Sequence, residues 1–150
     1  MQNQAFGLWV LVEQPRKAVN LMREILFRGK HHDGEWVEGN LFIPDKEDTP
    51  TQICIGTNVV RVSYEIIPET VGQYTGLTDK NGKKIFEGDI VEGADFTVED
   101  GGYGVVSFDE GAFEVNGNNI CGTFHENYWG KEFEVIGNIH DNPELFWGVE

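Results

Sequence analysis

Short apolar runs separated by polar turns make up most of the chain from residue 24 onward. Apolar and polar residues alternate from Val60 to Tyr64, as in a strand with one buried face. Comparable runs recur at intervals of about 8–12 residues, and Gly, Asn or Asp stands between them. No window of about 11 residues carries an apolar stripe at helical spacing. The pattern predicts a mainly β protein of short-stranded antiparallel sheets.

Turn residues divide the first half of the chain. Asp33-Gly34 predicts a hairpin turn, and residues 44–51 form a polar loop. Pro68 blocks a ladder donor, and Gly72 and Gly76 permit bends, so residues 66–77 are predicted to be a linker. Pro68 would allow a single helical turn at 68–71, because Pro suits a first helical position. The expected strands cover residues 24–28, 35–43, 51–55 and 58–62.

The second half is also expected to be β. Asn81-Gly82 is the strongest turn signal in the chain, and another turn is expected at residues 109–111. Gly88-Asp89 precedes a β-branched pair, as at the start of a strand in an SH3-like barrel. Gly137 indicates a bulge. The expected strands cover residues 84–86, 87–91, 104–108, 112–115 and 133–139.

Three stretches carry a resemblance to a known family. Residues 22–29 (MREILFRG) and 34–40 (GEWVEGN) form the first. The most specific is VGQYTGLTDKNGKKIFEGDIV at 71–91, and the third is VIGNIHDNPEL at 135–145. In order and spacing they resemble the YopX family of bacteriophage and prophage proteins. The resemblance implies a compact β fold whose second half is an SH3-like barrel or roll, and it implies no catalytic residues.

The hydrophobic pattern and the family resemblance together divide the chain into three parts. Residues 1–21 lie outside the resemblance and carry a net charge of +1, whereas residues 22–150 carry −16. Met22 resembles a natural start, so the preceding segment is expected to be an upstream extension or an added strand. Residues 22–70 are expected to form an N-terminal β subdomain. Residues 71–150 are expected to form an SH3-like β-barrel subdomain with a C-terminal tail.

The charge narrows the classes of partner. The formal net charge is −15, and no Lys or Arg lies between Lys84 and Lys131. Direct nucleic-acid binding is not expected, because affinity for a phosphate backbone rests largely on Lys and Arg. Basic protein surfaces, other cationic partners and divalent metals remain open, as does a role in solubility alone.

Known catalytic and metal-binding patterns are missing from the sequence. The pairs Cys121 with His125 and His140 with Asp141 supply ligand types, as does His31-His32-Asp33, but none has a complete metal-site spacing. There is no Gly-x-Ser-x-Gly elbow and no phosphate-binding Gly loop. Asp79-Lys-Asn-Gly82 only partly matches a calcium loop and is interpreted as a turn. We therefore expect no catalytic residue, metal or cofactor.

The expected compartment is the cytoplasm of a bacterial host. The chain has no apolar run of about 20 residues and no secretion signal at its start. Cys54 and Cys121 are isolated thiols, which are more often small buried side chains than a disulfide. No membrane association is expected.

The acidic second half is also rich in aromatic residues, which predicts a binding face. Such rings framed by carboxylates can hold a basic or proline-containing peptide, although they can equally fill a small core. The predicted face contains Asp95, Glu99, Asp100, Tyr103, Asp109, Glu110, Tyr128 and Trp129.

The function predicted is that of a non-enzymatic accessory protein that binds a host or phage protein. One version of this hypothesis has the acidic face imitate the charge of a nucleic acid. The apolar tail at residues 143–147 suggests a homo-oligomer. The alternative is a metal-dependent hydrolase or another small enzyme with a carboxylate site.

Overall fold

A computed structural model describes residues 23–46, 48–56, 61–93, 102–118, 120–123 and 133–147. These residues form antiparallel strands and one short helix, so the predicted mainly β class is confirmed. In chain order the elements are β1 (Phe27–His31), β2 (Trp36–Phe42), β3 (Gln52–Gly56), β4 (Arg61–Thr78), β5 (Lys84–Phe86), β6 (Asp89–Gly93), β7 (Gly102–Asp109), β8 (Ala112–Asn118), β9 (Ile120–Thr123), β10 (Glu134–Asn138) and α1 (Pro143–Trp147).

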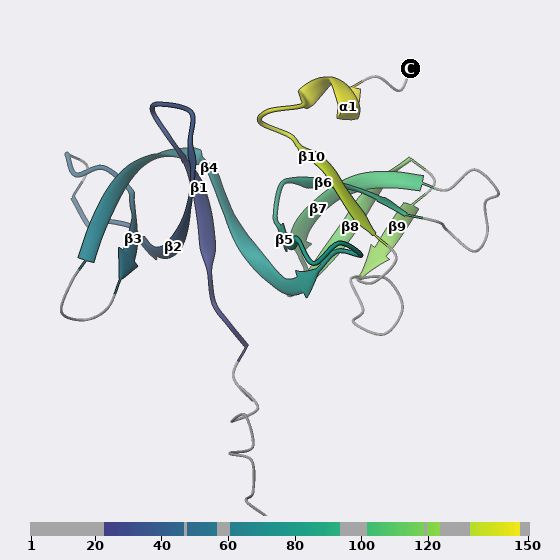
Figure 1. Ribbon diagram of the computed structural model, residues 1–150, viewed down its shortest axis with the longest axis horizontal. Coiled ribbons are helices and arrows are strands. Elements are labelled where there is room, and N and C mark those ends of the chain that lie inside the picture. Colours follow the sequence, from purple (N-terminus) through teal and green to yellow (C-terminus); the bar gives the residue numbers. More distant parts are fainter. Residues whose placement is uncertain are drawn as a thin grey trace, which may run out of the picture.

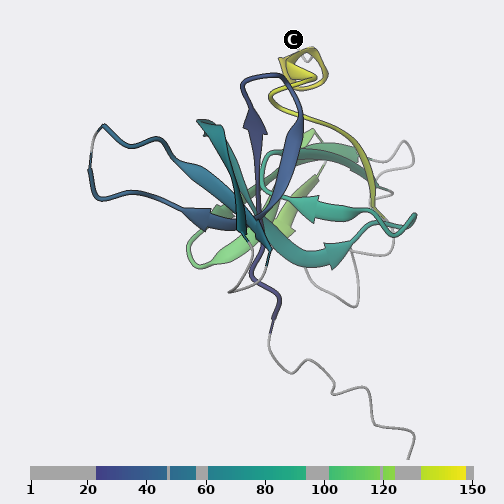
Figure 2. The same cartoon turned by 60° about the vertical axis from the view of Figure 1, so that its left-hand side comes forward.

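The strands form two sheets that lie side by side and are linked by β4 (Figure 1). The first has the order β1-β2-β3-β4-β5, and β1 also pairs with β4, so the pairings of β1 to β4 close on themselves. The second has the order β10-β6-β7-β8-β9. We call residues 23–73 the first lobe and residues 74–147 the second lobe. Figures 1 and 2 both place the turn before α1 beside the β1–β2 hairpin.

The linker predicted at residues 66–77 is wrong, because this segment is part of the 18-residue strand β4. The strand changes partner along its length, from β3 to β1 and then to β5. Its register with β1 shifts between the pairs Lys30↔Ile67 and Arg28↔Gly72. Pro68 lies inside this irregular stretch, where its missing N–H removes no ladder hydrogen bond.

The helical turn that Pro68 would allow at residues 68–71 does not form, and the Thr70 side chain explains how the strand continues. The Lys30 amide donates to the Thr70 hydroxyl oxygen at 2.8 Å. The same hydroxyl donates to the Ile67 carbonyl at 2.6 Å. A side chain thus takes over the hydrogen bonding that the ladder loses at the bulge.

Each lobe has its own cluster of buried apolar side chains. In the first lobe Val37, Ile53 and Ile66 form the cluster, and Gly29 makes room for it. A Cβ on Gly29 would lie 2.5 Å from Cδ1 of Ile66. In the second lobe the buried set contains Ile85, Val91, Val106, Val115, Phe133 and Val135. Each lobe therefore has its own buried cluster.

Most predicted turns are confirmed. Gly34 and Gly82 have φ values of 96° and 81°, and Glu110-Gly111 has positive φ at both residues in the β7–β8 turn. The register of β10 with β6 shifts at Gly137, which confirms the bulge. The sequence did not predict β9 or α1. In the described residues the edge strands β10 and β9 do not pair with each other, so SH3-like closure stays a prediction.

No helix among the described residues is long and apolar enough to span a membrane.

Candidate functional site

Acidic side chains and a tyrosine lie on the outer side of the second sheet. Glu92 on β6 lies opposite Tyr103 on β7, and Glu114 on β8 lies opposite Ser107. Neighbouring residues in these strands, such as Val106 and Val115, point into the core instead, because side chains alternate along a strand. We define the acidic face as Glu92, Tyr103, Asp109, Glu110 and Glu114.

Few cations lie near this face. Glu92 acts electrostatically on Lys80, but the ammonium of Lys80 is paired with Glu134. Residues 85–123 contain no Lys or Arg. Among the described residues, none of the six ion pairs involves a carboxylate of the acidic face. Residues 71–150 carry four Lys and 16 Asp or Glu, a net charge of −12. The face is therefore a source of negative potential.

The structure places only part of the predicted binding residues. Tyr103 is half-buried at one end of β7, whereas Asp109 and Glu110 are exposed at the other, about 20 Å away. Asp95, Glu99, Asp100, Tyr128 and Trp129 lie outside the described residues.

Two members of the acidic face, Glu92 and Glu114, were missing from the prediction. The alternation around Glu114 could have revealed it, because Phe113 and Val115 on either side are core residues.

The aromatic residues of β7 and β8 divide between core and surface. Phe113 is buried, and Phe108 packs against it with ring centroids 5.0 Å apart. Phe108 nevertheless leaves half of its surface exposed. Of the two alternatives for the aromatic rings, the core thus applies to Phe113 and an exposed surface to Phe108.

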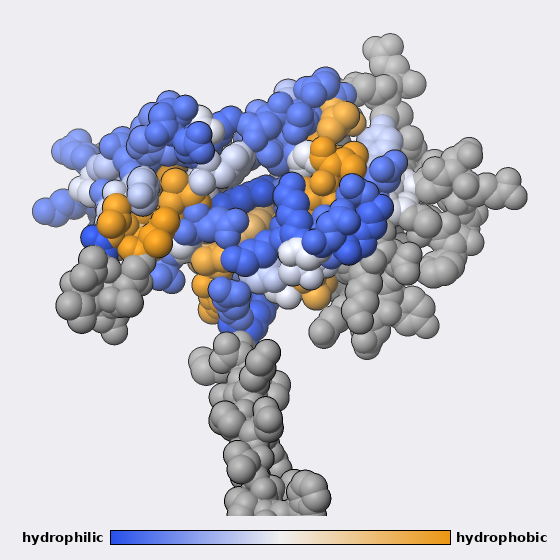
Figure 3. All heavy atoms as spheres, in the orientation of Figure 1, coloured by the Kyte–Doolittle hydropathy of each residue, from blue (hydrophilic) through white to orange (hydrophobic). Residues whose placement is uncertain are grey.

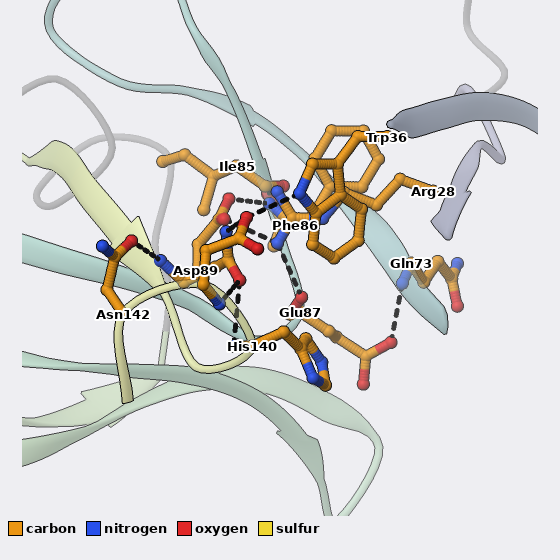
Figure 4. Close-up of polar contacts among 12 residues, drawn as sticks. Arg28, Trp36, Gln73, Ile85, Phe86, Glu87, Asp89, His140 and Asn142 are labelled. Atoms are coloured by element: carbon orange, nitrogen blue, oxygen red, sulfur yellow. Dashed lines mark hydrogen bonds and ion pairs between the residues drawn. The ribbon is translucent and has the colours of Figure 1, made fainter. Parts of the chain in front are cut away.

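A second group of polar residues joins the two lobes (Figure 4). Arg28 on β1 forms an ion pair with Asp89 on β6, with 2.6 Å between Nη2 and Oδ1. The other oxygen of Asp89 accepts the Phe86 amide at 2.8 Å. Burial raises the pKa of Asp89, and the charge of Arg28 opposes this effect. We call Arg28, Trp36, Asp89, His140 and Asp141 the junction cluster.

The guanidinium of Arg28 lies between two aromatic rings. Its central carbon is 4.7 Å from the ring centroid of Trp36 and 4.9 Å from that of Phe86. Nη2 also donates to the carbonyl oxygen of Glu87 at 3.3 Å. Nε is buried without a hydrogen-bond partner, so the stacked rings provide its surroundings. These contacts tie β1, β2 and the β5–β6 turn together.

The turn between β10 and α1 closes the junction from the other side. Asp141 accepts the indole N–H of Trp36 at 2.7 Å and the side-chain amide of Asn138 at 2.9 Å, and it pairs with Lys30. The hydrogen bonds from Asn138 and Lys30 hold the pKa of Asp141 well below its usual range. Burial lowers the pKa of His140, and the positive charges of Arg28 and Lys30 add to this effect.

Asp79 has a structural role. It is buried, and its carboxylate accepts the backbone amides of Asn81, Lys83 and Val135 at 2.8, 2.9 and 3.1 Å. Burial acts to raise its pKa, but these three hydrogen bonds outweigh burial and lower it. Asp79 thus shapes the Asn81-Gly82 turn and fastens it to β10, as the turn interpretation predicts.

Within the described part of the chain, no three His, Cys, Asp or Glu side chains are grouped so as to hold a metal ion. Cys54 is half-buried on β3 with Sγ 3.3 Å from Oγ of Ser63. The side chains of Cys121 and His125 are outside the described set. The junction charges satisfy one another, whereas those of the acidic face are available to an external cation.

Comparison with known proteins identifies a family and a solved structure of similar fold. The sequence model of the family described as YopX protein matches residues 26–146, which span both lobes. The fold is similar to the crystal structure of protein EF1440 from Enterococcus faecalis, with 25% sequence identity and a TM-score of 0.50. That similarity covers 81% of this chain and 97% of the other. No curated protein matches the sequence.

Proposed function

The chain belongs to the YopX family, and we propose that it is a non-enzymatic, phage- or prophage-encoded accessory protein that binds a basic protein partner. One observation carries the proposal. The carboxylates of Glu92, Asp109 and Glu114 lie on β6, β7 and β8, and that of Glu110 lies in the β7–β8 turn. None of these elements contains Lys or Arg, and none of the four carboxylates has an ion-pair partner among the described residues.

Lys and Arg side chains of a partner would supply the missing countercharges. A surface of one sign accelerates encounter with a surface of the opposite sign and makes binding dependent on salt. Tyr103 offers a ring on which an arginine of the partner can stack. The predicted residues Asp95, Glu99, Asp100, Tyr128 and Trp129 would extend this face.

The proposal also includes the two predicted units and the compartment. The separate buried clusters of the two lobes support a division into residues 22–70 and 71–150, although β4 crosses the boundary. We infer that the second unit is an SH3-like roll and that the protein acts in the cytoplasm of a bacterial host.

The test is affinity capture from bacteria that carry the phage or prophage. Glu92→Lys combined with Glu114→Lys reverses two charges on the acidic face. The matched control is Asp45→Lys combined with Glu69→Lys, which changes the net charge equally at two exposed positions of the first lobe. We expect wild type and control to retain a basic protein that elutes with salt, and the acidic-face variant to lose most of it. Equal retention by all three proteins contradicts the proposal.

Competition with duplex DNA tests whether the face imitates a nucleic acid. If the captured protein binds DNA through the same basic surface, added duplex should release it from the wild-type chain. Continued retention at saturating duplex would exclude imitation and leave an ordinary protein–protein contact.

A further inference from the structure

The first part of β4 has an open edge. Arg61 to Glu65 pair with β3 on one side, and β1 begins to pair with β4 only at Ile66. Within the described residues no strand pairs with the other side of this segment. All five residues are exposed, and they lie at the outer end of the first lobe (Figure 1).

The ladder with β3 determines which backbone groups face the open edge. The Ile66 amide donates to the Thr51 carbonyl at 3.1 Å. Because residues of an antiparallel pair alternate between bonding to a neighbour and facing away from it, Tyr64 and Val62 bond to β3. Arg61, Ser63 and Glu65 therefore direct their N–H and C=O groups outward.

The sequence of this edge is complementary to itself. When two copies pair antiparallel about Ser63, Arg61 of each copy lies opposite Glu65 of the other, and Ser63 lies opposite Ser63. We propose that the protein forms a two-fold homodimer through the β4 edges, with Ser63 on the axis. This places two oppositely charged pairs across the interface and gives every outward N–H and C=O of residues 61, 63 and 65 a partner.

The other face of the same strand adds apolar contacts. Val62 and Tyr64 are 51% and 37% exposed, and Ile55, which lies opposite Val62 on β3, is 44% exposed. In the proposed register Val62 of each copy lies opposite Tyr64 of the other. Figure 3 shows an apolar area over the part of the first lobe where β3 and β4 lie.

Charge also favours this lobe as the meeting point of two acidic chains. Residues 23–70 carry five Lys or Arg and nine Asp or Glu, a net of −4, against −12 for residues 71–150. Pairing through the β4 edge brings the less charged lobes together. The inference does not rest on the proposed function, since the acidic face belongs to the other lobe.

The contact is short, so we expect a weak dimer. Five residues of each edge are available before β1 occupies the position beside Ile66. Glu65 is also 3.4 Å from Nε2 of His32 in its own chain, but its side chain remains 53% exposed. A small, partly polar interface is typical of dissociation constants in the range of about 1–100 μM.

Sedimentation equilibrium of the full chain at about 0.15 M salt tests the register. We expect Arg61→Glu and Glu65→Arg each to weaken dimerisation about tenfold, because each places like charges opposite one another. The double variant restores opposite charges and should return to within about threefold of wild type. The matched control is Glu69→Arg on the same strand outside the register, which should leave the constant unchanged. A monomeric wild type at about 0.5 mM, or a double variant as weak as the single variants, would overturn the proposal.

A backbone variant tests the edge independently of charge. The Ser63 N–H faces outward, so Ser63→Pro removes a donor of the proposed interface without removing a backbone hydrogen bond to β3. It also removes the Ser63 hydroxyl, which lies 3.3 Å from Sγ of Cys54, so Ser63→Ala is the control for loss of that contact. We expect Ser63→Pro to give a folded monomer by circular dichroism and sedimentation. A folded Ser63→Pro protein that still dimerises like wild type would contradict edge pairing. If Ser63→Pro unfolds the chain, the single and double variants of Arg61 and Glu65 alone decide whether the β4 edges pair.

Discussion

Asp89 and Glu92 lie three residues apart on β6, yet they belong to regions of opposite character. Asp89 is 1% exposed, forms an ion pair with Arg28 and accepts the Phe86 amide. Glu92 is exposed and lies opposite Tyr103 on the acidic face. The same strand thus contributes one carboxylate to the junction between the lobes and another to an outer surface.

This difference separates carboxylates that hold the fold from carboxylates that are free to bind. At the junction, each charge meets cations, amides or rings that the folded chain supplies, and removing one partner leaves another buried. On the acidic face, Asp109 accepts the Glu110 amide at 2.9 Å, but the carboxylates form no ion pair among the described residues, so removing Glu92 or Glu114 leaves no buried charge without its counterion. Four predictions test the contrast, from the largest expected effect to the smallest.

Removal of the Asp89 carboxylate should have the largest effect on stability. Asp89→Ala leaves the Arg28 guanidinium buried without its counterion, and we expect the free energy of unfolding to fall by about 3–5 kcal/mol. Urea denaturation measures this change. The double variant Arg28→Met, Asp89→Leu should be less destabilised than Asp89→Ala, because no charge remains buried. A loss below about 1 kcal/mol in Asp89→Ala would show that the ion pair does not hold the lobes together.

Truncation of Asp79 should have the second largest effect on stability. Asp79→Ala removes the acceptor of three backbone amides, and we expect a loss of about 2–4 kcal/mol. Asp79→Asn keeps one oxygen acceptor and should lie between wild type and Asp79→Ala. The measurement is the midpoint of thermal or urea unfolding. Equal stability of the alanine variant and wild type would contradict the structural role of this aspartate.

The junction should also make stability depend on pH. The pKa of His140 is lowered in the folded chain from its usual value of 6.5, so its contribution is complete above pH 6.5 and is lost as the pH falls through the folded value. Asp141 and Asp79, whose pKa values are lowered from 3.8, add losses of the same sign in more acidic solution. Asp89 acts in the opposite direction, because its raised pKa favours the folded state when the carboxyl is protonated.

Urea unfolding at a series of pH values between about 7 and 5 isolates the histidine contribution. His140→Gln should flatten the decline in stability over that range. His32→Gln shows what the loss of an exposed histidine does by itself. If the slope of the unfolding free energy against pH is unchanged in His140→Gln, His140 does not contribute to the pH dependence.

Neutralising the acidic face should have the smallest effect on stability. Glu92→Gln combined with Glu114→Gln should change the free energy of unfolding by no more than about 0.5 kcal/mol, because neither carboxylate pairs with a described residue. The same variant should weaken capture of a basic partner. A destabilisation as large as that of Asp79→Ala would show that the two regions do not differ as described.

The sequence predicted well those features that depend on a few adjacent residues. Asn81-Gly82, Asp33-Gly34 and the turn at residues 109–111 were recognisable because positive φ favours Gly and a few polar residues locally. The family resemblance rests on similar features, since Asp79 and Asp89 in the most specific motif both accept backbone amides. The continuation of β4 through Pro68 was missed, because it depends on a bulge against β1 and on the Thr70 hydroxyl.

The candidate site was only partly predictable. The shortage of Lys and Arg after Lys84 is visible in the sequence, and it led to Tyr103, Asp109 and Glu110. Which carboxylates lie outward depends on strand register, which brought Glu92 and Glu114 into the face.

By itself the sequence determined the β class, the tight turns, the family and the surplus of negative charge, because each follows from composition or from residues close together in the chain. Only the tertiary structure decided which charges are paired within the protein. Arg28 and Asp89 are 61 positions apart, and Trp36 and Asp141 are separated by 105. Contacts at such separations arise only when the chain folds, and they distinguish the carboxylates that join the lobes from those left facing water.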